Sequence, residues 1–297
     1  MAESADRPVS SIYDLGYRPY DGPRLGRRHA IYALYVYSLG AVFGIGRSLL
    51  SKAFPIGLAI LAQIPALVQL AIAALVPLEL EYVAPEDYFG FVQVVLVLFC
   101  AVVAPEIIGR DQRNRTLPLY FSRALSRADY VSAKWLALAV ALVGVLTLPQ
   151  LILILGQAVA NTDLLGYLGD NLDLLPPILA SSAMVACYMA AVALAIASQT
   201  SKRAIATGAV LAYFVIFSAL GSILVETTTE EIGRFVVLVS PANVLEGSVH
   251  WIFSSAPPEG SDVAKVDLAD GFYFVAAIGY ALVALAVLYR RFLRLAV

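Results

Sequence analysis

Long apolar runs without charge constrain this sequence more than any other feature. Several stretches of 18 or more residues contain no Asp, Glu, Lys or Arg, and only 14% of the 297 residues are charged. A soluble domain of similar size carries about a quarter charged residues. About 20 consecutive apolar residues make a helix long enough to cross the hydrocarbon core of a membrane. The runs therefore predict an all-α integral membrane protein.

The charges between the runs predict the side of the membrane on which each loop lies. With six spans, 18 of the 20 Lys and Arg residues fall on one side, together with only 7 of the 22 Asp and Glu residues. Basic loops stay in the cytoplasm, so we expect a multi-pass protein of the cell (inner or plasma) membrane with both termini cytoplasmic. The six spans are expected at about 54–76, 89–108, 130–157, 174–197, 204–225 and 272–289.

The first apolar run, residues 30–52, is not counted among these spans. It is short, contains three glycines and has basic residues at both ends. If it crossed the membrane, basic residues would lie on both sides. We therefore expect an amphipathic elbow helix in the membrane interface, preceded by a turn-rich cytosolic segment over residues 1–29.

Two polar segments between spans are expected to form short helices. Residues 226–270 are too polar for a further span, and Ser240 followed by Pro241 fits the cap and first turn of an outer helix. On the basic side, Ser126 and Asp129 fit a capping box, so a helix is expected to begin near Arg127. Just before it, Thr116 is a candidate cap for a short apolar helix held at the membrane surface, where a cytosolic partner can dock.

Signatures of catalysis and metal binding are absent from the sequence. It contains no GxxxxGK[ST] phosphate loop and no HExxH motif, and its two histidines, His29 and His250, are expected on opposite sides of the membrane. Cys100 and Cys187 lie within apolar runs and are interpreted as buried thiols. The interiors of the spans carry no charged residue, which argues against an ion-coupled relay. We expect no catalytic residue, metal site or cofactor in this chain, and no nucleic-acid partner.

Three glutamines at membrane depth are candidates for lining a translocation path. Gln63 and Gln69 lie in the first span, where Pro65 is expected to cause a kink, and Gln93 lies in the second. Polar side chains at this depth face other helices or a water-filled path rather than lipid. The sequence is compatible with two roles for these residues: a hydrogen bond between helices, or the lining of a translocation path.

The basic segment resembles that of the ABC type-2 transporter permeases, the membrane subunits of ABC exporters. In that family an acidic residue and basic residues are followed by Gly-Thr-Leu, then by Ser-Arg and a Lys that enters the third span. The matching residues here are Asp111, Thr116 with Leu117, Ser126 with Arg127, and Lys134. Arg115 replaces the usual Gly, and no Pro precedes Ser126. The order of elbow, six spans, long outer segment and basic tail is also similar to the family.

The resemblance implies a permease domain over residues 30–297 that pairs with a second permease chain, identical or not, among membrane lipids. Each permease would dock a separate ATP-binding-cassette ATPase subunit, which carries the ATP and Mg, and ATP-driven closure would open an export path between the permeases. The coupling segment would be residues 109–127. Its candidate docking residues are Asp111, Arg115, Thr116, Leu117, Leu119, Tyr120, Phe121, Arg123, Ser126 and Arg127.

Two other hypotheses fit parts of the sequence. One is a membrane scaffold that an ATPase drives through the same coupling segment without net transport. The other is a membrane-embedded enzyme of lipid metabolism, which would need a catalytic cluster that the sequence does not display.

Overall fold

The computed structural model of the protein describes residues 22, 25–75, 83–122, 125–161, 163–228, 234–266 and 268–294. Within this part of the chain it contains helices and no strands, and six helical stretches are long and apolar enough to cross a membrane. The predicted all-α membrane fold is thereby confirmed. The six stretches are Ser51–Ile72, Tyr88–Arg113, Arg127–Ala160, Leu172–Ala197, Arg203–Thr227 and Gly271–Leu293.

The helices of the first half of the chain lead from the elbow region to the third span. In order they are α1 (Gly26–Val42), α2 (Leu49–Leu61), α3 (Ile64–Leu75), α4 (Tyr88–Ala104), the π-helical turn η1 (Pro105–Gly109), α5 (Arg110–Arg113), α6 (Leu117–Phe121) and α7 (Arg127–Ala160).

The second half contains three long spans and the helices that connect them. In order they are α8 (Leu164–Asp170), the 3-10 turn η2 (Leu172–Leu174), α9 (Leu175–Ala197), α10 (Arg203–Thr227), the 3-10 turn η3 (Val237–Val239), α12 (Pro241–Phe253), α13 (Asp262–Lys265) and α14 (Gly271–Leu293).

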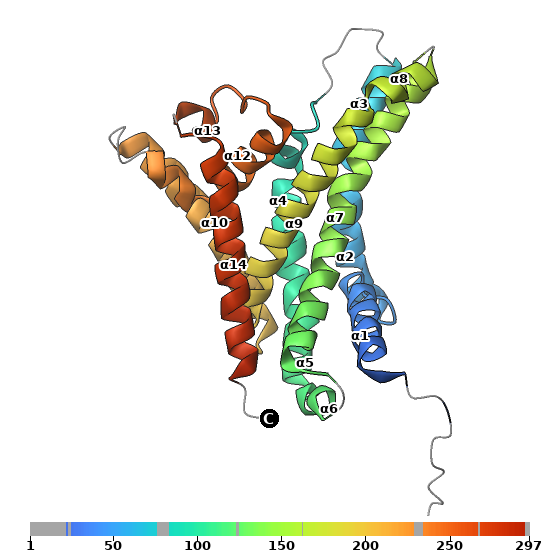
Figure 1. The fold of residues 1–297 in the computed structure, drawn as a ribbon, viewed down its shortest axis with the longest axis vertical. Helices are drawn as coiled ribbons and strands as arrows, with labels where there is room; N and C mark the ends of the chain where they lie inside the picture. The colour runs from blue at the N-terminus through green and yellow to red at the C-terminus, as the bar shows by residue number, and fades with distance from the viewer. Residues whose placement is uncertain are drawn as a thin grey trace, which may run out of the picture.

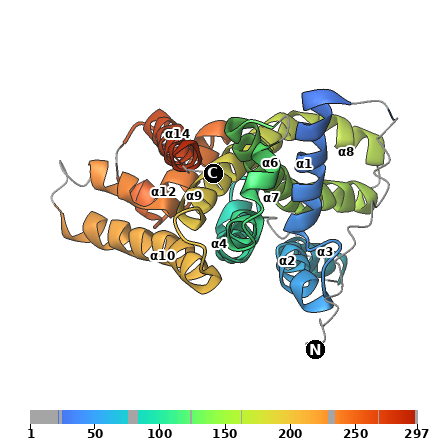
Figure 2. The ribbon, with the colours of Figure 1, turned by 90° about the horizontal axis from the view of Figure 1, so that it is seen from below.

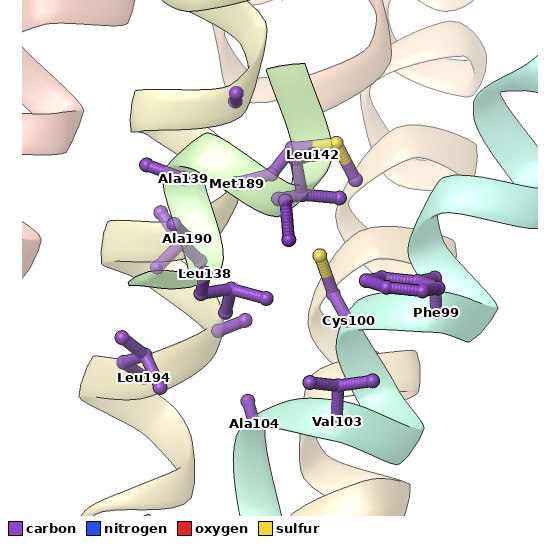
Figure 3. Close-up of a cluster of buried hydrophobic side chains, with 14 of the residues drawn as sticks. Phe99, Cys100, Val103, Ala104, Leu138, Ala139, Leu142, Met189, Ala190 and Leu194 are labelled. Carbon is purple, nitrogen blue, oxygen red and sulfur yellow. The ribbon is translucent and has the colours of Figure 1, made fainter. Parts of the chain in front are cut away.

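Helices α7 and α9 form the centre of the bundle and contact each other along their length (Figure 1). The core continues to α4, where Cys100 packs near Leu142 of α7 and Met189 of α9 (Figure 3). Alanines such as Ala139 and Ala190 line the same region, and small side chains let helices approach closely in a membrane. By contrast, α2, α3, α10 and α14 expose most of their apolar side chains, as expected for helices that face lipid.

The first apolar run forms two helices where a single elbow over 30–52 was expected. Helix α1 begins earlier, at Gly26, and ends at Val42, and α2 then starts the first span. Gly44 and Gly46 have φ values of +68° and +78°, a conformation that glycine adopts without a steric penalty. This turn changes the direction of the chain, so α1 is seen lengthwise where α2, α4 and α14 are seen end-on (Figure 2).

The first span is interrupted between Leu61 and Ile64, close to the kink predicted at Pro65. Proline lacks an N–H group and crowds the preceding turn, which breaks the helical hydrogen-bond pattern. The carbonyl oxygen of Ala62 lies at this break and accepts a hydrogen bond from the hydroxyl of Tyr88, 2.7 Å away. Tyr88 at the start of α4 therefore supports the kink of the first span.

The helical hairpin before the sixth span follows the predicted cap. The N–H of Asn243 donates to Oγ of Ser240 at 3.1 Å, and Pro241 occupies the first turn of α12. Gly247 allows α12 to lie against α14, because a Cβ atom at this position would be 2.5 Å from the ring of Tyr273. Helix α12 is thus fixed against the start of the sixth span.

Candidate functional site

The basic segment forms a tight helical hairpin at one end of the bundle (Figure 1). The second span does not end near residue 108 as expected, because η1 and α5 extend it to Arg113. After a three-residue turn, α6 lies at the end of the molecule, and α7 begins the third span at Arg127. The predicted short helix over Leu117–Phe121 is confirmed as α6.

The start of α7 is fixed by the predicted capping box. The N–H of Asp129 donates to Oγ of Ser126 at 3.1 Å, and the N–H of Ser126 donates to Oδ2 of Asp129 at 2.9 Å. Arg27 adds two hydrogen bonds from its guanidinium to the Asp129 carboxylate, at 2.8 and 2.9 Å. Since bidentate contacts of this kind fix direction as well as distance, they attach α1 to the third span.

The expected capping of α6 by Thr116 is wrong. The Thr116 hydroxyl donates instead to the carbonyl oxygen of Asp111 at 3.3 Å, and it caps no N–H of α6. Helix α6 begins without a side-chain cap because Pro118 in its first turn already has the helical φ angle.

Arg115 occupies the turn between α5 and α6 in the left-handed region, with φ of +52°. This conformation costs an ordinary L-residue roughly 1–2 kcal/mol and costs glycine almost nothing. The structure thus gives a physical reason for a glycine at this position, which the sequence fills with arginine.

A buried polar triad lies directly behind this hairpin. Nζ of Lys134 is 2.9 Å from Oδ2 of Asp111, and the hydroxyl of Tyr130 donates to the same oxygen at 2.7 Å. Lys134 is only 1% exposed and Asp111 8% exposed. Buried charges are tolerated when they are paired and hydrogen-bonded, so the triad joins the ends of the second and third spans.

Aromatic rings surround the triad and connect it to α6 and α14. The rings of Tyr120, Phe121 and Phe292 have their centroids 5.6, 5.8 and 5.3 Å from the ring of Tyr130. The guanidinium of Arg127 donates to the carbonyl oxygen of Leu293 at 2.6 Å, at the end of the sixth span. Burial, helped by the Asp111 carboxylate, raises the pKa of Tyr120 to about 12.

The candidate docking residues divide into an inner and an outer group. Leu117 is buried, and Tyr120 and Phe121 pack partly against the core, so these side chains hold α6 in place. Leu119 points outward and is 68% exposed, and Arg115 is exposed beside it. Arg123 lies outside the described residues.

Glu106 forms a second ion cluster that the sequence did not indicate as a site. Its carboxylate is 3.0 Å from Arg47, 3.0 Å from Arg203 and 3.6 Å from Arg113. These arginines belong to the α1–α2 turn, the start of α10 and α5. The signal available in the sequence was a single acid after a proline, at the basic end of an apolar run.

The family model for ABC-2 family transporter proteins matches residues 27–296. The chain belongs to the ABC-2 transporter family. Such a permease is the membrane subunit of an ABC transporter, associates with ABC ATPase subunits and is not itself the catalytic chain. No curated protein is similar enough to the chain to count as a match.

The three glutamines of this permease lie in different surroundings. Gln63 donates to the carbonyl oxygens of Ala59 and Val145 at 3.1 and 3.4 Å, and it borders a cavity of about 790 Å³ between α1, α2 and α7. Gln93 borders a separate cavity of about 260 Å³. The side-chain oxygen of Gln69 is buried without a hydrogen-bond partner among the described residues. A bond between helices is therefore observed for Gln63.

Proposed function

We propose that this permease is the membrane subunit of an ATP-driven exporter and that α6 is its coupling helix. One observation carries this proposal: α6 is held beyond the ends of two consecutive spans and presents Leu119 to solvent. An exposed leucine beside exposed basic residues suits a groove on a soluble partner with an apolar floor and an acidic rim. In this family that partner is an ABC ATPase subunit.

The contacts behind α6 support its role in transmitting movement. The rings of Tyr120 and Phe121 pack α6 against Tyr130 of the third span. Behind them, the Asp111–Lys134 pair joins the second and third spans, and Arg127 joins the third span to the sixth. Arg27 connects α1 to the same region through Asp129. A push on α6 would then act on several spans together, because packed helices move as rigid units.

The charge distribution supports the proposed orientation. The α6 end of the molecule carries most of the Lys and Arg residues, so we assign it and both termini to the cytoplasm of a cell membrane. Helix α1 would then lie as an elbow in the cytoplasmic interface. ATP and Mg would bind the ATPase subunits, and a second permease chain would complete the path for export.

The scaffold hypothesis predicts the same docking without transport, so docking and transport need separate measurements. The lipid-enzyme hypothesis would need a catalytic cluster, and no observation within the described residues favours it. Export by an ATP-driven permease is therefore the function that the observations favour.

The test is Leu119→Asp in the full permease, co-expressed with an ABC ATPase chain that co-purifies with the unchanged protein. We expect loss of the ATPase from the purified complex, since a carboxylate would be buried in an apolar groove. Leu165→Asp is the matched control, because Leu165 is 78% exposed on α8 at the opposite end. Unchanged co-purification of the Leu119→Asp protein would show that α6 is not the coupling helix.

Transport is measured on the same proteins after reconstitution. ATP-driven movement of a labelled cargo across vesicles supports the exporter. ATPase turnover without movement of any candidate cargo would instead support the scaffold.

A further inference from the structure

Two cavities are bordered by residues of α12, a helix that lies toward the end of the bundle opposite α6 (Figure 1). One is apolar and lies among α4, α9, α10 and α12. The other lies where α12 meets the start of α4. Phe89 borders both of them, and α12 contributes Leu245 to the first and Glu246 to the second. Two chemically different cavities therefore share the ring of Phe89 as a border.

The first cavity has the size and lining of a site for an aliphatic chain. It has a volume of about 260 Å³, and its wall includes Val97, Met189, Leu211 and Phe214. An apolar cavity of about 150 Å³ is already large enough to take up benzene. Ser218 and Gln93 are the polar residues at its border.

The second cavity is acidic. It has a volume of about 470 Å³ and is bordered by the carboxylates of Glu86, Asp87 and Glu246. Among the described residues, no Lys or Arg borders it. Burial raises the pKa of Glu246 against the opposing effect of a hydrogen bond with Ser261, and the nearby carboxylates of Asp262 and Asp87 add to the rise.

His250 borders this cavity and is held in place by polar neighbours on both ring nitrogens. Its side chain is only 4% exposed, and Nδ1 is 3.0 Å from Oγ of Ser255. Nε2 lies 3.7 Å from the carboxylate of Asp87. Both ring nitrogens thus face polar groups of the protein, and the ring forms part of the wall of the cavity.

The charge state of His250 keeps the cavity negative. Burial lowers the pKa of His250, against the opposing effect of Asp87, Glu86 and Asp270, so the neutral ring is favoured near pH 7. A neutral ring next to three carboxylates attracts a cation and repels an anion.

We propose that the two cavities together bind one cationic amphiphile, with its aliphatic chain among α4, α9, α10 and α12 and its ammonium head beside Asp87 and Glu246. This inference deepens the proposed transport function and rests on it, since it names the class of cargo. Phe89 lies where the chain and the head of the ligand join. An anionic or neutral amphiphile of equal length fills the same apolar volume without the charge attraction.

The test measures equilibrium binding to the full permease in nanodiscs of zwitterionic phosphatidylcholine, with empty nanodiscs subtracted. The probe is octyltrimethylammonium, and octyl sulfate and octanol are matched probes of the same chain length. We expect saturable binding of the cation at least tenfold tighter than of the other two. The variant Glu246→Gln with Asp87→Asn is expected to weaken cation binding at least tenfold, whereas Glu259→Gln, an exposed acid outside the cavity, is expected to leave it unchanged.

The aliphatic part of the site is tested on α10. Ser218→Phe places a ring in the apolar cavity and is expected to weaken all saturable binding, while Ile216→Phe on the exposed face of the same helix is the control. Each variant is checked for an unchanged elution profile, and Glu246→Gln alone replaces the double variant if that one does not fold.

Equal binding of the three probes, or unchanged cation binding after Glu246→Gln, would overturn the inference. A permease that docks its ATPase through Leu119 and fails to bind octyltrimethylammonium contradicts the assigned cargo class alone. Unchanged docking of the ATPase by the Leu119→Asp permease would instead contradict the proposed function.

Discussion

The ammonium of Lys134 lies 2.9 Å from the carboxylate of Asp111, in the interior between the second and third spans. Both groups are removed from water, and the hydroxyl of Tyr130 bonds the same carboxylate oxygen. Each charge therefore depends on the other for its place in the fold. The pair lies behind α6, so its integrity determines how firmly α6 is held.

Lys134→Met is expected to destabilise the permease by about 3–5 kcal/mol, the usual effect of removing one partner of a buried ion pair. The buried Asp111 carboxylate would keep only the Tyr130 hydroxyl as a partner. The measurement is the free energy of unfolding in mixed detergent micelles. Adding Asp111→Asn to Lys134→Met should recover part of the loss, because no uncompensated charge remains. Additive effects of the two substitutions would show that the pair is not coupled.

Arg115→Gly is expected to stabilise the α5–α6 turn by about 0.5–1 kcal/mol, since the left-handed penalty exceeds the extra chain entropy of glycine. The same unfolding measurement detects the change. Asn114→Gly is the matched control, because the neighbouring Asn114 has φ of −83° and gains nothing from glycine. A destabilised Arg115→Gly protein would mean that the arginine side chain makes a contact that outweighs the backbone strain.

Glu106→Gln is expected to lower the free energy of unfolding by about 1.5–3 kcal/mol, the range for losing hydrogen bonds to a charged group. It also leaves the three neighbouring arginines to repel one another, so added salt should restore part of the loss. Glu226→Gln is the comparison, because its pair with Lys265 is exposed and 3.8 Å long. Equal effects of the two substitutions would show that the Glu106 cluster contributes no more than a surface pair.

Stability is expected to fall as the pH drops below the usual histidine value of 6.5, because the folded protein lowers the pKa of His250. The unfolded chain then takes up the proton more readily than the folded one, which favours unfolding. Glu246 has the opposite sign: its raised pKa favours the folded state on acidification near 4.5. Thermal unfolding from pH 7.5 to 5.5 tests the histidine, and His250→Gln should flatten the curve. An unchanged curve would show that His250 does not titrate in this window.

The features that the sequence predicted well depend on neighbours along the chain. The six spans follow from apolar length, the cap at Ser126 follows from Asp129 three positions later, and the cap at Ser240 follows from the adjacent Pro241. The ends of the elbow were less predictable, because two glycines in a left-handed turn divide the run.

The features that the sequence could not predict depend on which helices lie side by side. Glu106 meets Arg47 and Arg203, which are 59 and 97 residues away along the chain, only after the bundle has assembled. In the same way, local pattern placed Leu117 with Leu119 on a docking surface, whereas tertiary packing turns Leu117 inward.

The π-helical turn at Pro105–Gly109 sets the direction of the residues that follow it. A π-helical turn holds one residue more than an α-helical turn, and each residue of an α-helix advances the chain by about 100° around the axis. Deleting one residue from the π-helical turn would rotate Asp111 away from Lys134. It would also move the hairpin that contains α6 to another side of the bundle. The angular position of α6 relative to the membrane spans thus depends on one inserted residue.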